Sequence, residues 1–166
     1  MSIFEISEVK SKKEFEKYLD DIISDKTERE KLYDKITLDD SIDLFRDYFE
    51  ENNAERKTNK QDYTPTNVAE LMATLAGSKA HNFYDGAAGT GTLIIAAWVK
   101  AGKPKDFFAY AWEYSDSVIP YLIHNLAFRN ISAEIVNGDT LTQEVFARYE
   151  LKQSEKYSEV IRCDID

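Results

Sequence analysis

Apolar residues recur at helical spacing through about the first 55 residues of the chain. The stretch "KKEFEKYLDDII" brings five of them onto one helix face: Phe15, Tyr18, Leu19, Ile22 and Ile23. The stretch "TLDDSIDLFRDYFEE" predicts a second helix, with a capping box of Thr37 and Asp40 followed by Ile42, Phe45 and Phe49. We therefore predict a helical N-terminal region, residues 1–58, that serves packing or partner binding.

From about residue 63 the pattern changes to alternating helices and strands. Four helices are predicted, in "TPTNVAELMATLAG", "TGTLIIAAWVKAG", "SVIPYLIHNLAFRN" and "TQEVFARYEL". Four short strands are predicted around them, in "HNFYD", "DFFAYAWEY", "AEIVNGD" and "YSEVIRC". This alternation predicts an α/β fold with a parallel, doubly wound sheet and right-handed crossovers, which forms a second domain over residues 59–166.

The first of these helices carries its own start and stop signals. Pro65 is expected at the first helical position and Gly77 at the end. Its apolar positions form a stripe that we expect to be buried: Val68, Leu71, Met72 and Leu75.

Composition narrows the class of protein. Hydrophobic residues make up 43% of the chain, which is enough for a folded core. No apolar run approaches the roughly 20 residues that span a bilayer, and the charged start does not resemble a signal peptide. The single cysteine, Cys163, excludes an internal disulfide and a cysteine-based metal site. We expect a cytoplasmic protein without a metal site or a membrane partner.

The net charge of −10, from 31 acidic and 21 basic residues, argues against this chain binding DNA by itself. Affinity for a phosphate backbone comes mostly from Lys and Arg. The one basic cluster, "ERKTNK" at Glu55–Lys60, is short and is typical of a solvated linker. If nucleic acid is bound, we expect another chain or segment to supply the positive surface.

Three carboxylates fall at the predicted ends of successive strands: Asp85, Glu113 and Asp139. In open α/β sheets, ligands bind outside the carboxyl ends of the strands. We therefore expect these three side chains to line one edge of the sheet. Each also has a plainer interpretation, as surface decoration or, for Asp139 in "NGDTL", as a turn residue.

The loop after Asp85, "GAAGTGT", contains three glycines, Gly86, Gly89 and Gly91. Glycines allow positive backbone dihedrals and a close ligand approach, and Thr90–Thr92 open a helix whose N–H groups favour a negative group. A tight strand-to-helix turn with glycines for packing remains an alternative. Neither the P-loop pattern nor G-x-G-x-x-G matches, which leaves the loop of S-adenosylmethionine-dependent methyltransferases. Glu113 would then accept ribose hydroxyls, and Asp139 an adenine amino group with Leu141 on the ring.

Four motifs in order resemble the DNA adenine-N6 methyltransferases, most closely the modification subunit of type I restriction-modification systems. They are "YTP" at Tyr63–Pro65, "DGAAGTGTLI" at Asp85–Ile94, "WEY" around Glu113 and "GDTL" at Gly138–Leu141. The resemblance covers roughly residues 60–165. It implies a Rossmann-like methyltransferase fold, S-adenosylmethionine as cofactor, and DNA and a specificity subunit as partners.

The resemblance also implies roles for individual residues. Tyr63, Thr64 and Pro65 would contact the methionine end of the cofactor, and Glu113 and Asp139 its ribose and adenine. The cofactor loop would comprise Asp85, Gly86, Ala87, Gly89, Thr90 and Gly91, with Leu141 beside the adenine.

Two positions depart from the family pattern. Gly86 stands where the family has proline, which loosens the turn. The family's Asn/Asp-Pro-Pro-Tyr/Phe element is expected after the fourth strand, where this chain has Asp164, Ile165 and Asp166. Asp164 is the one candidate for the catalytic position. We therefore expect an incomplete or degenerate methyltransferase domain.

Two other functions remain open from the sequence. A non-catalytic protein could bind restriction-modification subunits through its helical front end, or sequester the cofactor. A small-molecule methyltransferase is less consistent with "YTP" ahead of the glycine loop. His81 and His124 are expected to be structural or exposed, and Trp98 and Trp112 to belong to the core.

Overall fold

The computed structural model describes residues 3–37, 39, 41–45, 48, 64–76 and 81–165. The N-terminal helices are α1 (Ile3–Ile6), α2 (Lys12–Asp21), the 3-10 turn η1 (Ile22–Ser24) and α3 (Lys26–Asp34). The later helices are α5 (Thr66–Ala76), α6 (Thr92–Lys100) and α7 (Ile119–Phe128). The strands are β1 (Asn82–Asp85), β2 (Phe108–Glu113), β3 (Ser132–Asp139), β4 (Glu144–Lys152) and β5 (Glu159–Cys163).

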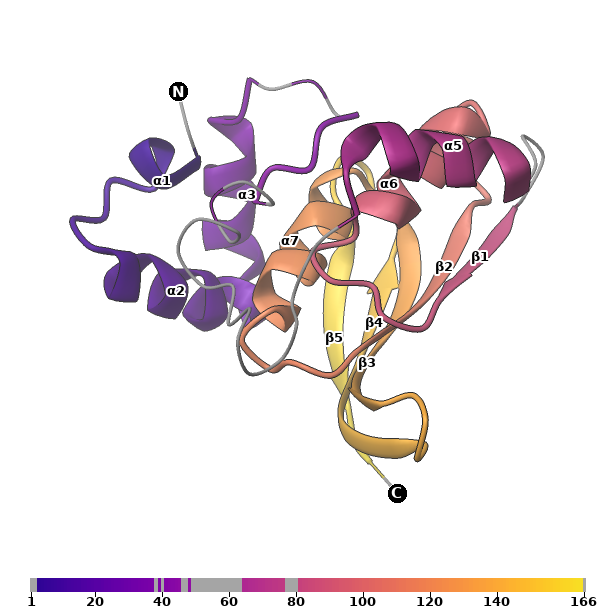
Figure 1. The fold of residues 1–166 in the computed structure, drawn as a ribbon. Helices are drawn as coiled ribbons and strands as arrows, with labels where there is room; N and C mark the ends of the chain where they lie inside the picture. Colours follow the sequence, from indigo (N-terminus) through magenta and orange to yellow (C-terminus); the bar gives the residue numbers. More distant parts are fainter. Residues whose placement is uncertain are drawn as a thin grey trace.

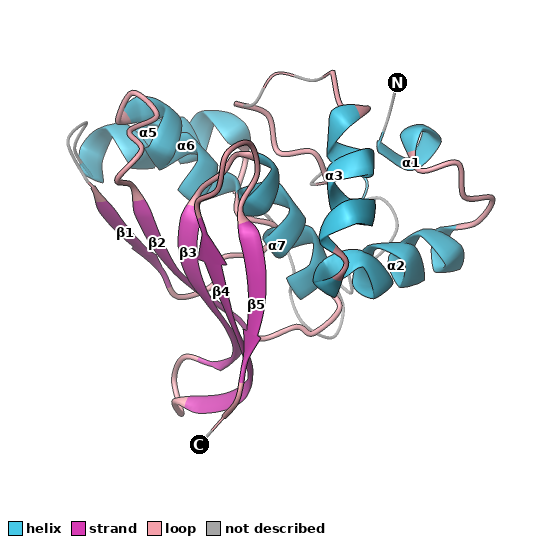
Figure 2. Ribbon diagram, turned by 180° about the vertical axis from the view of Figure 1, so that it is seen from behind, coloured by secondary structure: helices cyan, strands magenta, loops and turns pink. Residues whose placement is uncertain are grey.

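The strands form one sheet in the order β1-β2-β3-β4-β5. β1, β2 and β3 run parallel, and β4 lies antiparallel to both β3 and β5. Helices α5, α6 and α7 lie on one face of this sheet, as the views from both sides show (Figures 1 and 2). The predicted α/β fold is therefore confirmed, and its first three strands are parallel as expected. The predicted doubly wound arrangement is wrong for the described residues, because α5, α6 and α7 all lie on the same face of the sheet (Figures 1 and 2).

The helix predicted in "TQEVFARYEL" is wrong, because Glu144–Lys152 forms strand β4. Its exposure alternates with period two: Ala147 and Leu151 are buried, whereas Arg148 and Lys152 are exposed. A tight turn through Thr140–Gln143 returns the chain antiparallel to β3. The sheet therefore has five strands, and its last two pairings are antiparallel.

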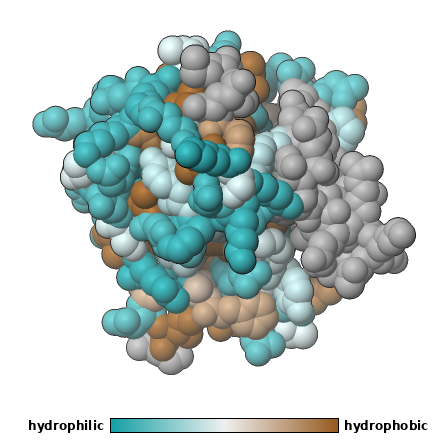
Figure 3. Space-filling model, turned by 90° about the vertical axis from the view of Figure 1, so that its left-hand side faces the viewer, coloured by the Kyte–Doolittle hydropathy of each residue, from teal (hydrophilic) through white to brown (hydrophobic). Residues whose placement is uncertain are grey.

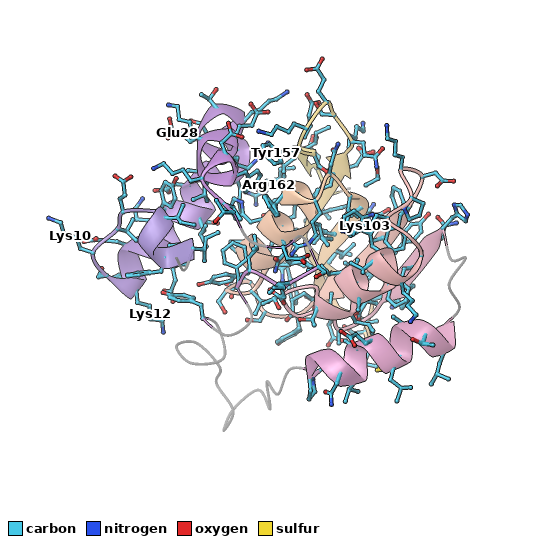
Figure 4. All side chains as sticks on the ribbon, turned by 90° about the horizontal axis from the view of Figure 1, so that it is seen from above. Lys10, Lys12, Glu28, Lys103, Tyr157 and Arg162 are labelled. Carbon is cyan, nitrogen blue, oxygen red and sulfur yellow. The ribbon has the colours of Figure 1, made fainter. Side chains whose placement is uncertain are left out.

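Helix α5 forms as predicted, but the prediction about its buried side is wrong. Val68, Leu71, Met72 and Leu75 are all exposed, whereas Ala69 and Ala73 are buried. The helix packs against α6, so these alanines make the contact. Figure 4 shows α5 at the edge of the molecule, with side chains pointing away from it. The helix begins at Thr66, one residue after Pro65, whose carbonyl accepts the N–H groups of Val68 and Ala69 (both 2.9 Å).

The second predicted N-terminal helix is not formed at residues 41–45, whereas Tyr48, further along the same stretch, is helical. Residues 41–45 are turns and bends, whereas Asp40 and Phe49 lie outside the described residues. Asp39 Oδ1 accepts the Ser41 N–H (2.8 Å), and Asp43 Oδ1 accepts the Phe45 N–H (3.0 Å). Such local side-chain bonds compete with helical ones, which explains the turns. Phe45 is buried as predicted, but Ile42 is exposed.

The N-terminal helices pack against the side of α7 that faces away from the sheet (Figure 1). The predicted α2 face is confirmed, since Phe15, Leu19, Ile22 and Ile23 are buried. Asp34 of α3 accepts bonds from Tyr157 Oη (2.9 Å) and Lys156 Nζ (2.5 Å), next to β5. Tyr157 is labelled beside α3 in Figure 4. The outer surface of this helical layer is mainly hydrophilic (Figure 3).

His124 of α7 joins these layers. Its Nε2 lies 2.8 Å from the carbonyl oxygen of Leu19 and therefore donates, so Nδ1 accepts from Tyr33 Oη at 2.7 Å. Complete burial lowers the pKa of His124 from 6.5 to about 4. The histidine is thus a neutral, structural link between α7, α2 and α3. In the part of the chain that the structure describes, no helix is long and apolar enough to cross a bilayer.

This buried histidine makes stability depend on pH. Its pKa is lower in the folded state, so the unfolded chain binds more protons between about pH 6.5 and pH 4. The contribution of His124 to the free energy of unfolding is therefore fully present above pH 6.5. As the pH is lowered through this window, that free energy falls by about 1.4 kcal/mol per pH unit. Urea unfolding at several pH values will measure the loss in the wild type and in His124→Gln. The carboxylates titrate in both proteins, so equal pH slopes would contradict a neutral, buried His124.

Candidate functional site

The carboxyl ends of β1, β2 and β3 meet, as the sequence predicts. Asp85 pairs in register with Ala111 of β2, and Glu113 pairs with Asn137 of β3. The glycine loop after β1 reaches both neighbouring strand ends. Gly89 N–H donates to Glu113 Oε2 (2.9 Å), and Thr140 Oγ1 donates to the Gly86 carbonyl (2.5 Å). Asp85, the loop, Glu113 and the turn after Asp139 therefore lie at one edge of the sheet.

Two of the three loop glycines have left-handed dihedrals. Gly89 has φ 56° and Gly91 has φ 95°, a region that side chains disfavour. Gly86 is different, because it is not among the residues with positive φ. A Cβ at Gly86 would lie 3.3 Å from both Thr140 Cγ2 and Tyr84 Oη. The expectation of positive dihedrals at all three positions is therefore wrong for Gly86, where glycine serves a close approach.

Glu113 is the best-positioned acceptor at this edge. Its two carboxylate oxygens accept the N–H groups of Gly89 (2.9 Å) and Ser115 (2.8 Å). Burial raises its pKa above the ordinary value; the nearby charge of Asp85 adds to this, whereas the backbone bonds oppose it. A half-buried carboxylate that touches the glycine loop is suited to bind hydroxyl groups of a ligand.

Asp85 is the second carboxylate of the site. Its Oδ1 accepts the Ala87 N–H at 3.2 Å, which shapes the start of the loop. Burial raises the pKa of Asp85, and the bond from Ala87 opposes the rise. Because a cation nearby favours the charged form, this edge is suited to a positively charged ligand group.

Asp139 adopts the turn geometry that the sequence left open as its plainer interpretation. Its Oδ1 accepts the N–H groups of Leu141 (2.8 Å) and Thr142 (3.2 Å). The turn nevertheless contacts the glycine loop, because Thr140 Oγ1 donates to the Gly86 carbonyl. Leu141 is 94% exposed at this turn.

Two other loop residues, Ala87 and Thr90, differ in solvent exposure. Ala87 is exposed, whereas Thr90 is completely buried. The Thr90 hydroxyl donates to Asp43 Oδ2, and the Thr92 hydroxyl donates to the same oxygen at 2.6 Å. The negative group beside the start of α6 is therefore supplied by the chain itself. Sequence reasoning missed Asp43, since nothing near it in the sequence indicates its distant partners.

Two other groups of predicted residues come from segments outside β1, β2 and β3. Thr64 and Pro65 precede α5, and Tyr63 lies outside the described residues. Asp164 follows β5, four strand positions away from β1. At about 4.8 Å per strand this separation is roughly 19 Å, so the structure does not bring Asp164 next to Asp85.

A separate groove of about 880 Å³ lies between α2, the start of α7 and strands β3–β5. Its lining mixes charges of both signs, among them Lys12, Glu16, Asp116 and Arg162, of which Lys12 and Arg162 are labelled in Figure 4. It does not include Asp85, Glu113 or the glycine loop. It adjoins the strand ends through Asn137, whose side chain donates to the carbonyls of Glu113 and Tyr114 (both 3.0 Å).

Replacement of Gly91 by alanine is expected to destabilise the fold more than replacement of Gly102. Both glycines have left-handed dihedrals, which cost an alanine about 1–2 kcal/mol. A Cβ at Gly91 would lie 2.9 Å from Leu122 Cδ1, whereas a Cβ at Gly102 would have nothing within 4 Å. We expect Gly91→Ala to lose about 1–3 kcal/mol more than Gly102→Ala in urea unfolding. Equal losses would show that Leu122 does not constrain the loop.

Comparison with known proteins gives one match. The profile of the N-6 DNA methylase family matches residues 40–161. No curated protein and no solved structure shows a significant match to the chain. The matched range includes Asp43, the glycine loop and all three strand-end carboxylates, and it spans well over half of the 166 residues. The chain therefore belongs to the N-6 DNA methylase family.

Proposed function

We propose that this chain binds S-adenosylmethionine at the carboxyl ends of β1, β2 and β3. It would act as the cofactor-binding part of a DNA adenine-N6 methyltransferase of the restriction-modification type. Members of the N-6 DNA methylase family use this cofactor. The main support is the position of Glu113, a half-buried strand-end carboxylate that contacts the glycine loop.

The geometry of Glu113 fits a ribose. A carboxylate offers about four lone-pair sites, and the N–H groups of Gly89 and Ser115 use two of them. The two ribose hydroxyls would donate to the remaining sites. A Cβ at Gly86 would lie 3.3 Å from side-chain atoms of Tyr84 and Thr140, so the loop backbone packs closely against these two residues. The residues present therefore fit an adenosyl group.

Asp85 fits the other end of the cofactor. S-adenosylmethionine carries a positively charged sulfonium and ammonium group. A positive group near Asp85 would favour the ionised carboxylate, which burial otherwise disfavours. Thr64 and Pro65, together with Tyr63, are proposed to contact the methionine end.

Asp139 and Leu141 are proposed to hold the adenine. Because both turn bonds of Asp139 go to Oδ1, the adenine amino group would donate to Oδ2. Leu141, which is largely exposed, would cover the ring. The bound cofactor supplies an electrophilic methyl group, and these residues of the chain orient it.

Contacts with DNA are proposed to come from another subunit or segment, such as a specificity subunit, because the chain carries a net charge of −10. The alternative function is a regulatory protein that binds the cofactor without transferring its methyl group. Methyl transfer from labelled S-adenosylmethionine to adenine-containing DNA distinguishes the two. Transfer supports the methyltransferase, and cofactor binding without transfer favours the regulatory protein.

Removing either strand-end carboxylate is expected to weaken cofactor binding. Bonds to a charged group contribute about 1.5–3 kcal/mol, so Glu113→Ala and Asp85→Ala should each raise the Kd at least tenfold. Isothermal titration calorimetry with S-adenosylhomocysteine and S-adenosylmethionine measures this change. Asp106→Ala is the matched control, because Asp106 pairs with His81 outside the proposed site, and its Kd should stay within about twofold of wild type. Unchanged affinity in both test variants would remove the site assignment.

A further inference from the structure

One carboxylate connects three segments that are distant in sequence. Asp43 Oδ2 accepts the hydroxyls of Thr90 and Thr92 (2.6 Å to Thr92), on either side of Gly91. Its Oδ1 accepts Asn125 Nδ2 of α7 (2.7 Å) and the N–H of Phe45 (3.0 Å). The segment around Asp43, the glycine loop where it enters α6, and the middle of α7 thus share this single group.

The partners of Asp43 are themselves fixed by burial. Thr90 and Asn125 are completely buried. Asn125 Nδ2 also donates to the Thr90 carbonyl (2.8 Å), and its Oδ1 accepts the N–H of Leu44 (3.1 Å). Arg129 Nη1 donates to the same Asn125 oxygen at 3.1 Å. Because buried polar groups without partners are costly, this network holds Thr90 in one position.

The glycine loop is therefore held from two sides. On the side of the strand ends, Gly89 N–H donates to Glu113. On the side of the N-terminal region, Thr90 and Thr92 donate to Asp43. Gly89 makes the first of these bonds and Gly91 lies between Thr90 and Thr92, and these two glycines are the residues of the loop with left-handed dihedrals. Glycines have the largest conformational freedom, so the loop backbone depends on its anchors for order.

We propose that Asp43 is a positioning residue for the cofactor loop, which makes the N-terminal region part of the binding site. This inference rests on the proposed binding of S-adenosylmethionine. Asp43 does not touch the cofactor. It holds Thr90 and Thr92 so that Gly89 and Gly91 present a preformed backbone surface, and the ligand then does not have to order the loop on binding.

The test compares carboxylates that both connect the N-terminal region to the rest of the chain. Asp43→Ala removes the bonds to the loop. Asp34→Ala, the matched control, removes the bonds to Lys156 and Tyr157 and leaves the loop anchored. By calorimetry with S-adenosylhomocysteine, Asp43→Ala should raise the Kd at least tenfold and Asp34→Ala less than twofold. Equal effects of the two variants would overturn the positioning role.

Two further measurements separate positioning from general loss of stability. Thr92→Val should weaken binding, and Asp43→Ala combined with Thr92→Val should bind no more weakly than Asp43→Ala alone, because both remove the same anchor. Hydrogen exchange of the amides of residues 89–92 should speed up in Asp43→Ala and not in Asp34→Ala. If Asp43→Ala does not fold, Asp43→Asn and Thr92→Val provide the same comparisons. Additive losses, or unchanged exchange in the loop, would contradict the role of Asp43.

The outcomes also distinguish this inference from the function on which it rests. If the wild type does not bind S-adenosylhomocysteine or S-adenosylmethionine, the proposed function fails and the cofactor role of Asp43 fails with it. If the wild type binds and Asp43→Ala binds equally well, the cofactor site stands and only the positioning role is overturned.

Discussion

Helix α7 has no exposed side from Ile119 to Ala127, and every polar group on it must therefore find a partner inside the protein. The sheet covers one side of the helix and the N-terminal helices cover the other. His124 bonds to Leu19 and Tyr33, and Asn125 bonds to Asp43 and Thr90. The need to satisfy these buried groups determines where the N-terminal helices dock and where the glycine loop lies.

This arrangement places the candidate site where three layers meet. The sheet supplies Asp85, Glu113 and Asp139 at its edge, and the helices behind it hold the loop between them. Here the glycines permit the backbone conformation, whereas Asp43, Asn125 and Glu113 select it.

The parts of the fold that depend on local signals could be predicted from the sequence. The strand ends and the glycine loop follow from short apolar runs and turn residues, and their meeting follows from parallel topology. The residues of β4 could not be assigned this way, because Val145, Phe146, Tyr149 and Leu151 suit a helical spacing nearly as well as a strand. The antiparallel pairing with β3, for example of Ala147 with Asn137, decides between them.

The other errors have a common physical cause. The pattern of residues along the chain does not show which distant residue or element a side chain contacts. In α5 the larger apolar side chains predicted a buried stripe, but close packing on α6 selects the small Ala69 and Ala73 instead. Asp43 lies in a stretch with many acidic residues, and its partners are 47 and 49 positions away. The spacing of apolar and polar residues along the chain does not reveal such long-range pairings.

The hydrophobic core that surrounds α7 includes Phe15 and Leu19 from the front of the chain as well as Ile123 and Ile135 from its second half. The two regions that the pattern of apolar residues separates at residue 58 thus share one interior. Melting of the front helices would open the same interior that supports the strands. The chain should therefore lose its structure in one concerted transition, with no stage at which the sheet survives alone.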